Sequence, residues 1–122
     1  MRNYVKQLNQ KIEQYRWLIF SKSINIECAE GEESGAIEGT IEFIDGSILD
    51  FTEWFSTFKF RYRFHYMDRG KSLIARWDSS PHHKEINTFP FHLHRPFGIE
   101  ESKPLRLMDV LDIVALKITE QI

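Results

Sequence analysis

The chain is short of several residue types, and each shortage excludes a class of protein. Cys28 is the single cysteine, so an internal disulfide is excluded and a reducing compartment is expected. Six glycines and four prolines in 122 residues are too few for a low-complexity or collagen-like chain. No run approaches the roughly 20 apolar residues that a membrane-spanning helix needs, and the N-terminus has no apolar leader. We therefore expect a cytoplasmic protein without membrane contact.

An excess of basic residues is also missing. The net charge is −2 and the isoelectric point is about 6.2, whereas a protein that coats nucleic acid needs a broad positive surface. An enzyme that contacts one or two phosphates is not excluded. The apolar fraction of 42% and the aromatic fraction of 14% predict one globular domain, residues 1–122, with a bulky core.

The pattern of apolar residues predicts two helices around a run of strands. Residues 1–16 are amphipathic at the spacing of a helix, and residues 100–122 carry a wide apolar stripe that begins near Pro104. The segments between them are rich in alternating aromatic and β-branched residues; these predicted strands cover 17–28, 36–44, 47–55, 57–67 and 73–78. Asp45-Gly46 predicts a two-residue hairpin turn with positive φ at both positions. The expected fold is α+β, an antiparallel meander of about five or six strands flanked by an N-terminal and a C-terminal helix.

Glu53 is out of place in this pattern, because it shares a face with Leu49, Phe51 and Phe55. A carboxylate on an apolar face is costly unless it is paired. We expect Glu53 to be either the buried counter-ion of Arg76 or a general base with a raised pKa.

The most unusual stretch is "RWDSSPHHKEINTFPFHLH", residues 76–94, which holds four of the five histidines. Pro81 and Pro90 stiffen it, and a loop of this length without structure of its own is usually functional or disordered. His92 and His94 project from one face if the segment is extended. His82 and His83 are adjacent, so only one of them is expected to point inward.

Arg76 and Asp78 share a face of the strand that precedes this loop. They predict either a surface ion pair or a site in which Arg76 binds a phosphate or carboxylate and Asp78 orients an imidazole. Arg61 and Arg63 form a basic stripe on the neighbouring strand and are candidate substrate contacts. Tyr62 is a third candidate contact, although its position on the aromatic face is also typical of a core residue.

Histidine pairs also bind metals. His92 and His94 are the expected ligands if a divalent ion such as zinc is present. Their spacing matches no closed structural motif, and the single cysteine lies elsewhere. We therefore expect no cofactor, with a divalent metal as the alternative.

Taken together, these motifs resemble the TumE-type toxins of toxin–antitoxin systems. The resemblance depends on a strand that ends in Arg-aromatic-Asp, followed by Pro-His-His and by a Thr-Phe-Pro segment that closes on spaced histidines. In this chain those residues are Arg76, Trp77, Asp78, Pro81, His82, His83, Thr88, Phe89, Pro90, His92 and His94. The chain departs from the family pattern at Phe91, where a histidine is expected. The resemblance implies a neighbouring DNA-binding antitoxin as partner.

Three hypotheses for function follow. The first is a metal-independent ribonuclease in which His92 or His94 is the base, His82 or His83 is the acid, and Arg76 neutralises the phosphorane. The second is a transferase or metal-dependent hydrolase. The third is a binding module whose histidine-rich loop docks an antitoxin without chemistry. The expected partners are a helix-turn-helix antitoxin, RNA as substrate, and a second copy of the chain, because two helices leave part of the aromatic sheet uncovered.

Overall fold

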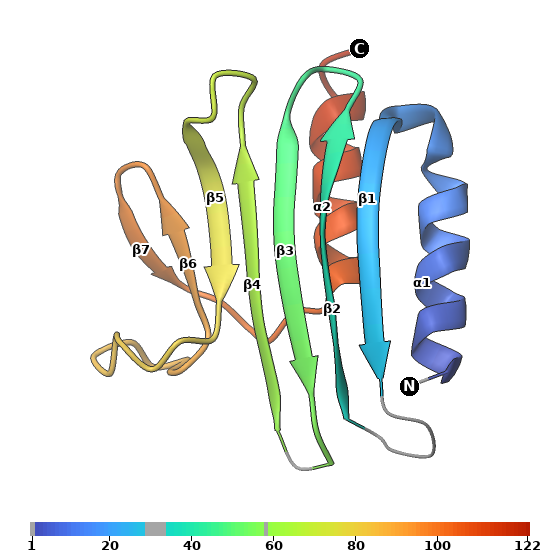
Figure 1. Cartoon of the computed structure of the whole chain (residues 1–122). Helices are drawn as coiled ribbons and strands as arrows, with labels where there is room; N and C mark the ends of the chain where they lie inside the picture. Colours follow the sequence, from blue (N-terminus) through green and yellow to red (C-terminus); the bar gives the residue numbers. More distant parts are fainter. Residues whose placement is uncertain (1, 29–33, 58) are drawn as a thin grey trace.

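The computed structural model describes residues 2–28, 34–57 and 59–122. A seven-stranded antiparallel sheet is flanked by an N-terminal and a C-terminal helix, and both helices contribute to the single core on one face of the sheet (Figure 1). The elements, in chain order, are α1 (Arg2–Gln14), a 3₁₀ turn (Arg16–Leu18), β1 (Ile19–Cys28), β2 (Gly35–Phe43), β3 (Ile48–Phe55), β4 (Phe60–Met67), β5 (Leu73–Asp78), β6 (His92–Arg95), β7 (Gly98–Glu101) and α2 (Leu107–Thr119).

The sheet is a pure meander, because every strand pairs with its neighbours in the sequence, from β1 to β7. The predicted α+β class and meander are therefore confirmed. The two strands that were not expected, β6 and β7, have four residues each and follow the histidine-rich loop. The segment that holds His92 and His94 is therefore extended, which is the condition under which the two side chains project from one face.

The alternation along the strands divides the sheet into two faces. The helix face is covered by α1 and α2, and in Figure 1 α2 lies behind the sheet. Its buried residues are mostly aromatic and aliphatic: Ile37, Ile41, Phe43, Leu49, Phe51, Tyr62, Phe64, Tyr66, Ala75, Trp77 and Leu93. The opposite side, here called the open face, carries the polar residues of the same strands. The histidine-rich loop belongs to the end of the sheet formed by β5, β6 and β7.

Two local expectations were wrong. The β2–β3 hairpin has four residues between its strands, and of its two central residues only Gly46 has a positive φ, at 87°. Asp45 instead accepts hydrogen bonds from the backbone nitrogen and hydroxyl of Ser47, which stabilises the longer turn. The C-terminal helix begins at Leu107 rather than near residue 100, because the preceding residues form β7 and Pro104 lies in the connection.

Within the predicted strand 57–67, Phe58 lies outside the described residues, and β4 begins at Phe60. No helix in the described part of the chain is long and apolar enough to cross a bilayer. The expected homodimer stays a prediction.

Candidate active site

Strand register places the polar residues of β4, β5 and β6 side by side on the open face. Asp78 is the partner of Arg63 on β4 and of His92 on β6. In the next row, Arg76 is the partner of His65 and of His94. Residues paired across neighbouring strands have Cα atoms about 4.5–5.5 Å apart. Two rows of cations, imidazoles and one carboxylate therefore lie side by side across three strands.

Three of the four histidines of the loop region come together; His83, His92 and His94 form what is here called the histidine cluster. The ring centroids are 4.9 Å apart for His83 and His92, 5.5 Å for His83 and His94, and 4.7 Å for His92 and His94. The three rings stand nearly perpendicular to one another, at 71–74°. His82 is exposed and has no part in these contacts. Only one histidine of the adjacent pair was expected to point inward, and that histidine is His83.

The carboxylate of Asp78 connects the cluster to the rest of the site. Its Oδ1 accepts hydrogen bonds from the backbone nitrogen and hydroxyl of Ser80 and lies 2.7 Å from Nε2 of His92. Its Oδ2 accepts a hydrogen bond of 3.2 Å from Nε of Arg76 and lies 3.6 Å from Nε2 of His94. Only 7% of the Asp78 side chain is exposed, and these donors and cations offset the cost of burying its charge.

His92 is held in one orientation from both ends of its ring. Its Nδ1 lies 3.0 Å from the carbonyl oxygen of Pro90, which can only accept, so Nδ1 is assigned the proton. Nε2 then faces the Asp78 carboxylate oxygen, and two lone pairs at 2.7 Å would repel each other. The arrangement therefore accommodates a proton or another cation between these two atoms.

His94 is more accessible than His92, with 17% of its side chain exposed against 2%. Burial and the nearby Arg76 guanidinium lower the pKa of His94, so its ring is neutral at pH 7. His65, the fifth histidine, lies in the same row, and burial, Arg63 and Arg76 lower its pKa as well. Neutral imidazoles beside a fixed guanidinium can accept a proton from a bound substrate.

The loop itself is braced by turns and by one threonine. The Thr88 hydroxyl donates to the carbonyl oxygen of Phe91 and accepts a hydrogen bond from the backbone nitrogen of Ser102. Phe91 stacks on Tyr62 with ring centroids 6.0 Å apart and planes at 8°. Side chains 91 and 92 alternate across the chain. The phenylalanine that replaces an expected histidine thus contacts the core and leaves the histidine cluster intact.

The cluster could also hold a metal ion. One ligand atom from each of His83, His92 and His94 lies within 4.8 Å of the others. Three imidazoles are a donor set that suits zinc. The Pro90 carbonyl beside Nδ1 of His92 is an outer acceptor that would orient this ring with Nε2 as the ligand atom. The metal alternative considered from the sequence named His92 and His94; the structure adds His83.

The expected substrate contacts divide between the two faces. Arg61 and Arg63 are exposed on the open face, and Arg63 is the register partner of Asp78. Tyr62 is buried on the helix face, and burial raises its pKa to about 12, so the phenol stays neutral. Its predicted place in the core is confirmed; its role as a substrate contact stays a prediction.

Glu53 lies on the opposite side of the sheet from the histidine cluster. It is completely buried, and its carboxylate accepts hydrogen bonds from the Tyr4 hydroxyl at 2.6 Å, from Nε of Arg106 at 3.1 Å and from the backbone nitrogen of Leu107. The expected pairing with Arg76 is therefore wrong, because Arg106 is the partner. Its burial raises its pKa as expected, but nothing among its described contacts links it to the site.

Two residues near the site were not identified from the sequence. Ser80 secures Asp78 through an Asx turn, for which the signal was present as a serine two residues after an aspartate. Trp54 lies on the open face with 47% of its surface exposed. An alternation that places a tryptophan on the polar side of a strand is the signal that could have identified it.

Comparison with known proteins identifies a family. The family model described as "Toxin TumE" matches residues 8–122, which is nearly the whole chain. No curated protein and no solved structure gives a significant match.

Proposed function

The chain belongs to the TumE toxin family, and thus to the toxins of toxin–antitoxin systems, and we propose that it acts as a metal-independent ribonuclease. The observation that supports this proposal is the convergence of three imidazoles, Asp78 and Arg76 on the open face. Cleavage of RNA next to a 2′-hydroxyl needs a base, an acid and a cation, and no further reagent.

In the proposed reaction His94 is the base and His83 is the acid. His94 takes the proton of the 2′-hydroxyl, whose oxygen attacks the adjacent phosphorus. The bond from phosphorus to the 5′-oxygen breaks, and His83 gives that oxygen a proton, which leaves a cyclic phosphate. The exposure of His94 and His83, 17% and 26% of their side chains, supports these roles. His92 is almost completely buried and is assigned to positioning.

Arg76 is assigned to the charge that develops on the phosphate. Its Nε donates to Asp78, which fixes the guanidinium, while 31% of the side chain remains exposed. A guanidinium held in this way presents its terminal nitrogens to two phosphate oxygens at once. Preorganised donors of this kind stabilise a transition state because they need not reorient during the reaction.

The test compares two adjacent histidines of one loop. We expect purified wild-type chain to degrade single-stranded RNA in the presence of EDTA. His83→Ala is expected to reduce the initial rate by roughly 100-fold, because general acid catalysis is lost. His82→Ala, at the exposed neighbouring position, is the matched control and should cleave at the wild-type rate. Equal rates for both variants would contradict the assignment of His83.

A second candidate function is a zinc-dependent hydrolase that uses the same cluster. The ligand atoms within 4.8 Å of one another favour it, and a zinc site with three histidines leaves a coordination position for water. His83, His92 and His94 would hold the ion, which would supply an activated water. Cleavage that stops in EDTA and returns with zinc would select this function over the metal-independent one.

Family membership implies a cognate antitoxin. We propose that it is a helix-turn-helix protein encoded beside this chain, as the resemblance to the family suggests. Co-expression of the adjacent reading frame should restore growth to cells that produce the toxin. If neither adjacent frame encodes such a protein, the assignment of the antitoxin fails, while the ribonuclease proposal is unaffected.

A further inference from the structure

Next to the histidine cluster the surface contains a recess, here called the aromatic notch. It has a volume of about 690 Å³, and its walls include Trp54, Lys59, Arg61, Arg63, Phe89 and Phe91. The notch forms because β5 ends at Asp78, opposite Arg63, so the first residues of β4 have a paired strand only on the β3 side. Ser79 bonds to the backbone of Tyr62 at this point, and the loop then turns away.

The walls of the notch are flat rings that the fold leaves partly exposed. Trp54 of β3 is 47% exposed and Phe89 of the loop is 39% exposed. Tyr62 and Phe91, which also line the notch, stack on each other with their planes at 8°. Exposed aromatic rings are the usual platform on which proteins stack the bases of single-stranded nucleic acids. The volume also falls within the range of small-ligand sites.

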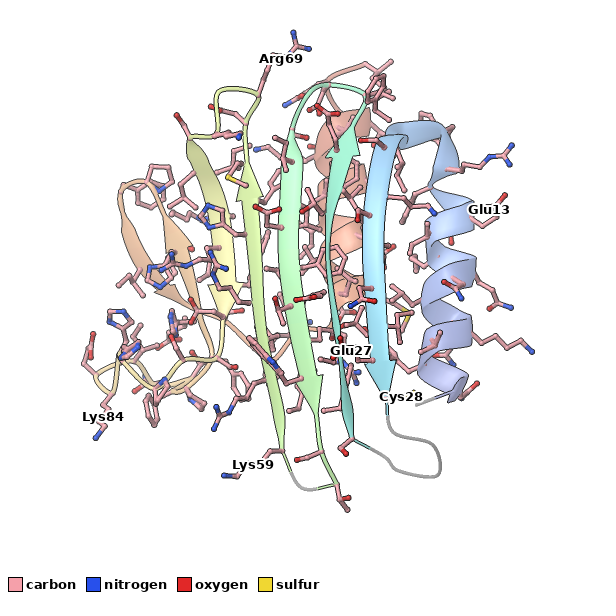
Figure 2. All side chains as sticks on the ribbon, viewed as in Figure 1. Glu13, Glu27, Cys28, Lys59, Arg69 and Lys84 are labelled. Carbon is pink, nitrogen blue, oxygen red and sulfur yellow. The ribbon has the colours of Figure 1, made fainter. Side chains whose placement is uncertain are left out.

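The charge of the notch is opposite to that of the whole chain. Lys59, Arg61 and Arg63 line it and are exposed, while the net charge of the protein is −2. Among the described residues, none of the three cations forms an ion pair. In Figure 2 Lys59 projects from the lower end of β4 on the side of the loop. The one acid in the lining, Asp78, is already paired with Arg76.

The notch and the histidine cluster share a wall. Asp78 lines the notch through its position at the end of β5, and its carboxylate contacts His92 and Arg76. Arg63 is its register partner, and Arg61 lies two residues farther along β4, about 6.8 Å away. A chain whose phosphate lies at the cluster would thus place the adjoining nucleotide over Arg63 and Arg61.

From this arrangement we infer that the aromatic notch binds one unstacked nucleobase of single-stranded RNA, next to the phosphate held at the histidine cluster. The inference rests on the proposed ribonuclease function and specifies its substrate. A base paired within a duplex cannot enter the notch, because its faces are covered by its neighbours. The protein therefore cleaves single-stranded segments and discriminates against double-stranded RNA.

The experiment measures binding separately from cleavage. A short single-stranded RNA carrying 2′-O-methyl groups cannot be cleaved by the proposed reaction, and its affinity for the full chain is measured by fluorescence anisotropy. Trp54→Ala is expected to weaken binding by roughly tenfold, and Trp54→Phe by much less, because a ring remains for stacking. Trp17→Ala is the matched control, since Trp17 is 60% exposed on the 3₁₀ turn outside the notch, and it should bind like the wild type.

Cleavage kinetics give the second readout. On unmodified RNA, Trp54→Ala should raise KM by a similar factor and leave kcat nearly unchanged, because Trp54 contacts the flanking base rather than the reacting phosphate. A perfectly paired hairpin should compete poorly for the wild-type chain. Equal binding of single-stranded and paired RNA, or no effect of Trp54→Ala on either measurement, would overturn the inference.

The outcomes separate this inference from the ribonuclease proposal. Binding that depends on Trp54 without any cleavage would support the notch and contradict the ribonuclease. Cleavage with an unchanged KM in Trp54→Ala would support the ribonuclease and contradict the notch. If Trp54→Ala leaves RNA binding intact but abolishes association with the cognate antitoxin, the notch is a protein-docking surface and the RNA inference is wrong.

Discussion

Cells that express a His92→Ala/His94→Ala double variant are expected to keep growing under conditions in which the wild-type chain arrests them. The substitution removes the proposed base, His94, and the ring that Asp78 and Pro90 hold beside it. Loss of general base catalysis alone slows a reaction by roughly 100- to 10,000-fold. Growth curves after induction, with soluble protein measured in the same cultures, test this expectation.

Loss of toxicity must be separated from loss of folding. His92 is 1% exposed and contacts a buried carboxylate, so its replacement could destabilise the chain. His94→Asn alone is therefore included, because that side chain lies at the surface of the cluster and asparagine still fills most of its volume. His82→Ala controls for the removal of an imidazole elsewhere on the loop. Arrest that persists in the soluble double variant would rule out both catalytic functions and leave the loop as a docking surface.

The parts of the fold that were predictable are those in which burial alternates along a long strand. In β3 and β4 the helix face reads Leu49, Phe51, Tyr62, Phe64, and each of these is buried. Such a period identifies a strand without knowledge of its neighbours. The β6–β7 hairpin was not predictable in this way, because four-residue strands contain too few positions to show a period.

The sequence indicated which residues form the site, but not how their side chains are arranged. The number of histidines and the Arg76–Asp78 pair identified the site in the sequence, whereas the choice of His83 over His82 depends on turns within the loop. The partner of Glu53 was missed for a different reason. Arg106 immediately precedes the C-terminal helix, and tertiary packing brings it to Glu53 near the end of β3. No local pattern in the sequence indicates that Arg106 and Glu53 lie in contact.

Replacing Arg106 with methionine is expected to lower the free energy of unfolding by about 3 kcal/mol, because it leaves the buried Glu53 carboxylate without its cation. The guanidinium also lies 4.0–4.7 Å from the ring centres of Tyr4, Phe55 and Phe60, a contact that methionine replaces only in part. Urea denaturation measures the change. Arg16→Met is the matched control: its ion pair with Glu13 is 70–80% exposed, so a change below about 0.5 kcal/mol is expected.

A second substitution distinguishes the charge from the packing. In Arg106→Met/Glu53→Gln no buried charge is left unpaired. The single glutamine oxygen can accept from the Leu107 nitrogen, while the amide nitrogen can donate to the Tyr4 hydroxyl oxygen, which turns from donor to acceptor. The double variant should therefore be more stable than Arg106→Met alone. The single variant Glu53→Gln completes the comparison. If the double variant loses as much stability as Arg106→Met and Glu53→Gln lose together, the two residues are not coupled. The contribution of Arg106 then comes from its packing on the aromatic rings instead.

The pH dependence of the Arg106→Met deficit follows from the pKa of Glu53. Burial raises that pKa, while Arg106 and Tyr4 lower it, so removal of Arg106 raises it further. Burial and Glu53 raise the pKa of Tyr4, which stays protonated and adds no charge. A carboxyl with a higher pKa in the folded state binds more protons there, so its folded form gains stability as the pH falls. The deficit should thus be largest at a pH above the folded-state pKa of Glu53 in the variant and shrink as the pH falls through it. A deficit that is constant across this range would show that Glu53 has the same protonation state in both folded proteins, and would contradict the proposed effect of Arg106 on its pKa.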